Sequence, residues 1–201
     1  MVMNFLKGYR WKSKTDKILL TFDDGPLPEV TPQLLDKLDE HFIKAVFFWV
    51  GENVKKHPSL AREVINRGHT IGNHTMNHKN LLLQQKEIIV EEIQKCTEII
   101  EQTTGVSPKY FRPPKGRITF GLEQIVYELG MIPVMWSLLT RDYNNRQNLV
   151  TFVVENYLKT DSIVVFHDSL KSSEILLNSV SELVKQAAIN QFTFGVAQEC
   201  L

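Results

Sequence analysis

The amino-acid sequence predicts an α/β fold in which parallel strands are joined by helical crossovers. Short strand-like segments alternate with longer segments that carry apolar residues at helical spacing, a pattern typical of a parallel sheet. The strand-like segments are apolar runs, as expected for buried strands. An open doubly wound sheet and a closed or irregular (β/α) barrel both fit this alternation. Since no linker, repeat or low-complexity tract interrupts it, we expect one domain over residues 1–201, with a core from about residue 17.

Each predicted strand is short and ends near a turn signal or a polar residue. The first strand is residues 17–22, and Gly25 and Pro26 then force a turn. Apolar runs of this length predict strands in a sheet. The later predicted strands are residues 45–50, 69–72, 110–112, 132–137, 162–166 and 192–196.

The predicted helices lie between these strands. Thr31 is predicted as the N-cap of the first helix, with Pro32 at its first helical position. Its apolar stripe is Leu34, Leu35, Leu38 and Phe42. The second helix, residues 58–67, begins with a proline and is followed by Gly68. The remaining predicted helices are residues 84–101, 119–129, 149–158 and 174–188.

Composition excludes some classes of function. The 23 basic residues equal the 23 acidic residues, so the chain lacks the basic excess that nucleic acids or acidic membranes would attract. Cys96 is predicted to be a packed small hydrophobe, and with Cys200 it suggests no disulfide framework. No stretch is long enough to span a membrane, and residues 1–10 do not read as a signal peptide. The sequence as written is therefore expected to be cytoplasmic, or to belong to the cell envelope or the exterior if an export signal has been removed.

Two adjacent carboxylates and two histidines are candidate metal-site residues. Asp23 and Asp24 follow the first strand, where one carboxylate can hold a metal ion while its neighbour acts as a base; a turn with Asx capping is the alternative. His74 and His78 are four residues apart, and on a helical turn both imidazoles would share one face. Two neutral imidazoles and a carboxylate such as Asp24, with an open position, form a catalytic zinc-type ligand set. Coincidental spacing is the alternative.

Polar residues also follow the later strands. His167 ends the run 162–166, where a catalytic group is expected on the C-terminal face of a barrel; a strand-capping histidine paired with Asp168 is the alternative. The prolines after Arg112 can hold a backbone amide rigidly toward a ligand, or form only a stiff turn. His41, His57 and His69 are read as structural or exposed. Because parallel strands share one C-terminal face, we expect a single site from Asp23, Asp24, His74, Arg112, Trp136 and His167.

Five motifs stand in one order along the chain: TFDDGP, HTMNH, YFRPPKG, MWSLLTRDY and IVVFHD. With these motifs the chain resembles the polysaccharide deacetylase family, the nodulation-factor deacetylase homology domain of carbohydrate esterase family four. The resemblance runs from about residue 17 to the C-terminus. It implies a distorted (β/α) barrel with mostly parallel strands, fewer or less regular than in the eightfold form.

The resemblance implies a role for each matching residue. Asp24, His74 and His78 match the metal ligands of the family. The metal would be one divalent ion, most often zinc, with cobalt, nickel or manganese as alternatives. Asp23 matches the catalytic base, and His167 matches the acid that protonates the leaving amine.

Further matches concern the groups around this centre. Arg112 matches the residue that pairs with the base, and Asp142 matches the carboxylate that orients the acid histidine. The backbone amide of Lys115 matches the oxyanion donor. Trp136 and Tyr143 are expected to contact the substrate.

Four positions depart from the family pattern. Lys115 stands where tyrosine or phenylalanine is usual, Tyr143 where tryptophan is common, and Leu139 where many members have aspartate. Val165 replaces the leucine that usually lines the acetyl pocket. These departures concern the choice of substrate, because none removes a metal ligand or a proton-transfer group.

The resulting expectation is a metal-dependent hydrolase that removes acetyl groups from N-acetylated sugars of the chitin or peptidoglycan type. Three alternatives stay open: an O-acetyl ester hydrolase acting on xylan-like glycans, a hydrolase of small cyclic amides, and a non-catalytic glycan-binding protein. The expected partner is an acetylated sugar or oligosaccharide, with no nucleic acid and no membrane span.

Overall fold

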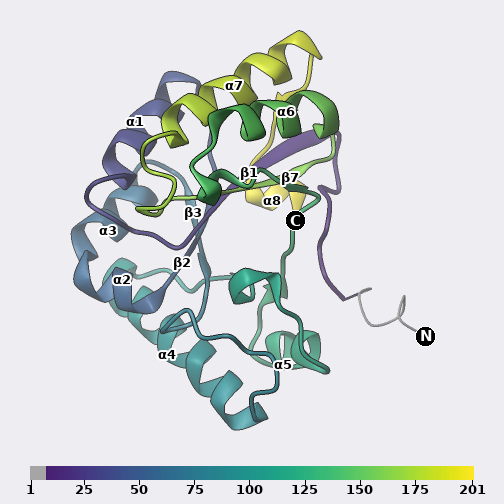
Figure 1. Cartoon of the computed structure of the whole chain (residues 1–201). Coiled ribbons are helices and arrows are strands. Elements are labelled where there is room, and N and C mark those ends of the chain that lie inside the picture. The colour runs from purple at the N-terminus through teal and green to yellow at the C-terminus, as the bar shows by residue number, and fades with distance from the viewer. Residues whose placement is uncertain (1–7) are drawn as a thin grey trace.

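The sheet of this protein curls into an incomplete barrel (Figure 1). The computed structural model describes residues 8–201, and the strands of this segment run in the order β5-β4-β3-β2-β1-β7-β6, with β8 beside β1. Every pair of these strands is parallel. The strands are β1 Lys17–Asp23, β2 Val46–Trp49, β3 Thr70–Asn73, β4 Tyr110–Phe111, β5 Ile132–Pro133, β6 Leu138–Leu139, β7 Ile163–His167 and β8 Thr193–Phe194.

The strand order explains the curl. β5 and β6 follow each other in the chain, yet they lie at opposite edges of the sheet. Only residues 134–137 join them. The five peptide steps from residue 133 to residue 138 span at most about 17 Å when fully extended, so the two edges must lie within that distance of each other. A flat sheet cannot satisfy this limit. The distorted barrel is therefore confirmed, and the open doubly wound alternative is wrong.

Helices cover the outer face of the curl, except for the short C-terminal helix α8, which packs with Leu19 on the inner face (Figure 1). Each helix predicted from the sequence is present, with boundaries shifted by a few residues, and the short helices α2 and α8 were not predicted. The helices are α1 Thr31–Glu40, α2 Gly51–Lys56, α3 Pro58–Asn66, α4 Lys86–Thr104, α5 Leu122–Glu128, α6 Gln147–Tyr157, α7 Leu176–Ile189 and α8 Ala197–Cys200. In the part of the chain that the structure describes, the 3-10 turns Pro114–Gly116 and Asp142–Asn144 follow β4 and β6.

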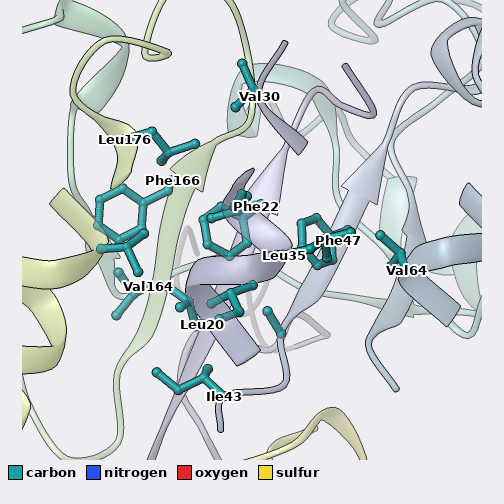
Figure 2. Packing of buried hydrophobic residues seen from close by; sticks show 14 of the residues in the cluster. Leu20, Phe22, Val30, Leu35, Ile43, Phe47, Val64, Val164, Phe166 and Leu176 are labelled. Carbon is teal, nitrogen blue, oxygen red and sulfur yellow. The ribbon is translucent and has the colours of Figure 1, made fainter. Parts of the chain in front are cut away.

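Alternate residues of each strand face opposite sides of the sheet. On β1, Leu20 and Phe22 point outward into the cluster under the helices (Figure 2). Phe22 packs there between Phe47 and Phe166, with ring centroids 5.1 and 6.0 Å away. Leu19 belongs to the inner cluster. The same alternation places the side chains of Thr21 and Asp23 inside the curl, so Asp23 lies at its mouth.

The predicted strand 132–137 is wrong. Only residues 132–133 and 138–139 are strand, and they belong to the two edges of the sheet. The first half of the segment between them is buried, with Val134 and Met135 at 0% and 2% exposure, whereas Ser137 is exposed. An apolar run of this kind is indistinguishable from a buried strand by pattern. The carbonyl oxygens of Val134 and Met135 accept hydrogen bonds from the side chain of Arg112.

The start and the end of α1 also differ from the prediction. Thr31 is the first helical residue and Val30 the N-cap, without a side-chain capping bond. The Thr31 hydroxyl instead accepts the Leu27 amide and donates to Asp168. Phe42 is not part of the apolar stripe, because the helix ends at Glu40 and Phe42, with φ of 57°, is 92% exposed.

Other sequence predictions concern burial. Cys96 is a fully buried free thiol on the inner side of α4, as predicted, and Cys200 is buried as well. His69 is also buried and structural: its Nδ1 accepts the amide of Ala45, and burial lowers its pKa to about 4. Within residues 8–201, no helix has the length and apolar composition that crossing a bilayer requires.

Candidate active site

A pocket of about 320 Å³ opens at the C-terminal ends of the strands. The structure brings most of the residues proposed from sequence to its walls. The lining residues are Asp23, Asp24, His74, His78, Lys115, Trp136, Tyr143 and His167, together with Leu139 and Lys171. Strand register explains the meeting, because Asp23 is paired directly with His167 between β1 and β7.

Asp24, His74 and His78 form a compact group of possible metal ligands. One oxygen or nitrogen from each lies within 4.8 Å of the others. The Asp24 Oδ1 atom is 3.2 Å from His78 Nε2 and 3.8 Å from His74 Nε2. Asp24 itself has a φ of 90°, in a region where side-chain-bearing residues are strained, so the turn after β1 holds this carboxylate in an uncommon backbone conformation.

The state of His74 suits metal binding. Its Nδ1 atom lies 2.7 Å from the carbonyl oxygen of Arg112, to which it must donate a proton, so Nε2 carries the free lone pair. Burial lowers the pKa of His74 to about 3, against the opposing charge of Asp24, and the imidazole is neutral. Two imidazole nitrogens and one carboxylate oxygen are the donors that zinc and similar divalent ions take. The residues present therefore fit a divalent cation.

The loop between the two histidines is not the helical turn that the spacing suggested. Residues 74–78 form no helix, and Thr75 and His78 have φ of 68° and 52°. Glu92 of α4 holds this loop: its side chain accepts hydrogen bonds from the backbone and side-chain amides of Asn77, and its carbonyl accepts the Met76 amide. The sequence analysis did not predict this role of Glu92. A charged residue beside Ile89 and Ile93 on a predicted apolar helix face could have indicated a buried carboxylate with a structural partner.

Asp23 is paired with a buried cation. Its Oδ1 atom lies 2.7 Å from Nη1 of Arg112, whose side chain is fully buried. The guanidinium also donates to Thr21 and to the carbonyl oxygens of Val134 and Met135, and it stacks 4.1 Å from the Phe48 ring. All these contacts fix one position for Arg112, and the pair keeps Asp23 at a fixed place in the wall of the pocket.

His167 is bound to Asp142, not to Asp168 as the alternative from sequence suggested. The Asp142 Oδ1 atom lies 2.8 Å from His167 Nδ1, and its Oδ2 atom accepts the His167 amide at 2.7 Å. Burial lowers the pKa of His167, but the hydrogen bond and charge of Asp142 outweigh it and raise the pKa to about 9. Nε2 is left to face the pocket, and the ring is protonated at neutral pH.

Asp168 has a different task. It is fully buried, and its carboxylate accepts hydrogen bonds from the Gly25 amide at 2.9 Å, the Trp49 indole at 3.0 Å and the Thr31 hydroxyl at 3.2 Å. Gly25 is required beside it, because a Cβ there would lie 1.9 Å from Asp168 Oδ2. Asp168 thus holds the turn that carries Asp24, a role that sequence reasoning missed.

The remaining proposed residues are placed as follows. Lys115 lies in the 3-10 turn after β4 with φ of 58°, and the next residue is a glycine whose Cβ would meet the Trp136 ring at 2.3 Å. The Tyr143 ring stands edge-on to His167, with centroids 5.1 Å apart. Val165 is fully buried and is not among the residues that line the pocket. Lys171, which the sequence did not single out, adds a second exposed cation to the rim.

A curled parallel sheet with a divalent-cation ligand set at its C-terminal face defines the class of protein: an irregular (β/α) barrel with its site at the strand ends. Residues 11–134 match the family model described as polysaccharide deacetylase. The chain belongs to the polysaccharide deacetylase family.

Individual relatives agree with this assignment. A peptidoglycan-N-acetylglucosamine deacetylase of Bacillus cereus is 42% identical over 127 residues, covering 63% of this chain and 46% of the relative. A chitooligosaccharide deacetylase of Azorhizobium caulinodans is 35% identical over 160 residues, covering 78% of this chain and 76% of the relative. The crystal structure of the Bc1960 peptidoglycan N-acetylglucosamine deacetylase superimposes with a TM-score of 0.92 at 29% identity, covering 100% of this chain and 94% of that one. The chain spans only 37% to 46% of the length of the first curated relatives it matches.

Proposed function

We propose that this protein is a metal-dependent hydrolase that removes acetyl groups from N-acetylated sugars in glycans of the peptidoglycan or chitin type. The observation that carries the proposal is the pocket itself. A carboxylate paired with Arg112 and an imidazole paired with Asp142 face the same space as Asp24, His74 and His78. A base, an acid and a metal ligand set are the parts that hydrolysis of an amide requires. Relatives named as deacetylases of peptidoglycan and of chitooligosaccharides support the substrate class.

The residues of this chain divide the reaction between them. Asp23 removes a proton from the attacking water, and Arg112 holds that carboxylate in place. The backbone amide of Lys115 donates to the oxyanion that develops on the acetyl carbonyl. His167 then protonates the leaving nitrogen, because an amine anion is a very poor leaving group. Asp24, His74 and His78 would hold one divalent ion, which we expect to be zinc and which, when bound, would polarise the carbonyl as a Lewis acid and lower the pKa of water.

Release of acetate tests this proposal. The protein is incubated with N-acetylglucosamine oligomers, peptidoglycan fragments and acetylated xylan, as prepared, after chelation, and after chelation with zinc restored. We expect acetate from the N-acetylated substrates, lost on chelation and regained with zinc. Metal-loaded protein that releases no acetate from any N-acetylated sugar would contradict the proposal.

Replacement of His167 by alanine separates protonation of the leaving group from binding. The variant is expected to keep its metal and to lose about 100- to 10,000-fold in turnover of acetamide substrates, the usual contribution of general acid catalysis. Esters with good leaving groups need little protonation and should lose much less. Kinetics on an N-acetyl sugar and on an activated acetate ester measure the difference. Equal losses on both substrates would show that His167 binds and does not donate a proton.

The Asp142→Asn variant tests the pKa of His167. His167 donates its proton only when it is charged, so activity should fall as pH rises through its pKa, which Asp142 raises to about 9. Removal of the Asp142 charge lowers that pKa, and the alkaline limb of the kcat–pH profile should move to lower pH. Asp161→Asn, at an exposed ion pair with Lys12, is the matched control and should leave the limb in place. An unmoved limb in Asp142→Asn would exclude His167 as the titrating acid.

Lys115→Tyr is expected to change substrate preference more than rate. Any non-proline residue supplies the backbone amide, and the two preceding prolines restrict the loop, so turnover of a small acetamide should stay within about tenfold, or about 1.4 kcal/mol of barrier. A cation at the rim favours anionic glycans, whereas a ring favours neutral sugar faces. The ratio of kcat/KM for acidic muropeptides to that for neutral chitin fragments should therefore fall. Lys109→Tyr, at an exposed position before β4 at the opposite end of the barrel, is the control. A loss of turnover on every substrate, with the metal still bound, would show that the Lys115 side chain has a catalytic role.

A further inference from the structure

A second hollow of about 410 Å³ lies beside the catalytic pocket, between the edge strand β6 and helix α6. Leu139 of β6 lines both hollows, so the two meet at this one side chain. The groove then follows α6 away from the pocket, from Arg141 past Phe152 to Tyr157. Since α6 has 11 residues, it is about 16 Å long, and the groove can follow a ligand well beyond the reacting group.

The walls of this groove are aromatic and open to water. Phe152 and Tyr157 are 53% and 57% exposed, and their rings stand 6.2 Å apart at 73° to each other. The core contacts of α6 come from Val150 and Val154, and from Val153, which also lines the groove. The exposed rings are thus not needed to anchor the helix. Large aromatic side chains gathered on one open groove mark a binding surface.

The chemistry of the groove fits a sugar chain. A pyranose ring has an apolar C–H face, which packs against an aromatic ring, and an edge of hydroxyl groups, which needs hydrogen-bond partners. Arg141 supplies donors at the end of the groove nearest the pocket, is exposed, and makes none of the ion pairs found within residues 8–201. Leu139 leaves the junction with the pocket apolar and without a carboxylate. These features favour binding, in the groove, of the sugar units that continue the glycan chain from the catalytic pocket.

We propose that the groove between β6 and α6, lined by Leu139, Arg141, Phe152 and Tyr157, binds sugar units that lie several positions from the acetyl group being removed. This inference rests on the proposed function. Binding energy gained far from the reacting bond raises kcat/KM for long substrates that reach the groove and gives nothing to short ones. The protein therefore prefers long glycan chains to short fragments.

The test compares chain lengths. Rates are measured on N-acetylglucosamine oligomers of two to six units with the unaltered protein and with a Phe152→Ala/Tyr157→Ala double variant. The ratio of kcat/KM for the hexamer to that for the dimer should exceed one in the unaltered protein and fall about tenfold in the variant. Phe42→Ala is the matched control, because Phe42 is an exposed aromatic residue after α1, at the other end of the barrel, and it should leave the ratio unchanged. Thermal unfolding of the three proteins checks that each of them folds. Arg141→Gln changes the same groove independently and should also lower the ratio of kcat/KM for the hexamer to that for the dimer.

A binding measurement separates this inference from the proposed function. Calorimetric titration of the hexamer into Asp23→Asn, with and without the two aromatic substitutions, measures how much the groove contributes to the Kd of the hexamer in the absence of turnover. Weaker binding of the hexamer after the substitutions supports the groove proposal. If no oligomer releases acetate, that second result overturns the proposed function and leaves the groove proposal standing. Acetate release that does not depend on chain length, or a Kd for the hexamer that the substitutions leave unchanged, would overturn the groove proposal while the reaction stands.

Discussion

Replacement of His78 by alanine is expected to remove the metal ion and the acetate-releasing activity together. His78 Nε2 lies 3.2 Å from Asp24 Oδ1, and without it only one imidazole and one carboxylate face the metal position. Loss of a direct ligand should weaken metal binding by more than the roughly 10- to 100-fold that changes in supporting residues cost. The fold should persist, because His78 lies at the rim of the barrel and is not part of its core.

Elemental analysis after dialysis and an acetate assay measure both quantities on one preparation. His57→Ala is the matched control, because His57 lies between α2 and α3 and does not line the pocket. The control should keep metal and activity. Metal content that stays at the unaltered level in His78→Ala would remove His78 from the ligand set.

Asp23→Asn should leave the metal in place and abolish most turnover. Asparagine has nearly the same shape and can still meet Arg112, but it cannot take a proton from water. We expect kcat to fall by about 100- to 10,000-fold, which corresponds to roughly 2.7–5.4 kcal/mol of barrier. Asp23 lies 4.0 Å from His74 and is not needed to complete the group formed by Asp24, His74 and His78.

The measurement combines kcat on an N-acetylated oligosaccharide with metal content and thermal unfolding. Asp161→Asn makes the same chemical change at an exposed ion pair and should have no effect on any of them. If Asp23→Asn loses its metal as well, Asp23 is a ligand. If kcat of Asp23→Asn stays within tenfold of that of the unaltered protein, another group is the base.

The arrangement of strand ends could be predicted from sequence because it follows from local patterns and one topological rule. Apolar runs followed by Asp23, His74, Arg112 and His167 predict parallel strands, and parallel strands share one C-terminal face. The four-residue spacing of His74 and His78 likewise drew attention to the pair. The loop conformation between them could not be predicted, since it depends on the hydrogen bonds that Asn77 donates to Glu92, a residue of a different element.

Other features depend on packing between distant segments. Residues 132–137 have the pattern of a strand, but the buried guanidinium of Arg112 takes the carbonyl oxygens of Val134 and Met135 and the chain crosses to the other edge of the sheet. The exposure of Phe42 depends on where α1 ends. Lys171 reaches the pocket from the loop after β7, at a position with no local signal of function. Patterns within one segment carry no information about such contacts.

The hydrogen bonds of Asp168 have a consequence for how this chain can diverge. Its carboxylate joins the turn after β1, the end of β2 and the start of α1 to the end of β7. The Gly25 amide, the indole of Trp49 and the hydroxyl of Thr31 all donate to that one carboxylate, and a Cβ at residue 25 would collide with both Asp168 and Trp49. A change at residue 168 would leave three donors buried without an acceptor, and a change at any of the three would weaken its solvation in turn. These four positions, spread over 144 residues from Gly25 to Asp168, are therefore expected to vary together or not at all as related chains separate.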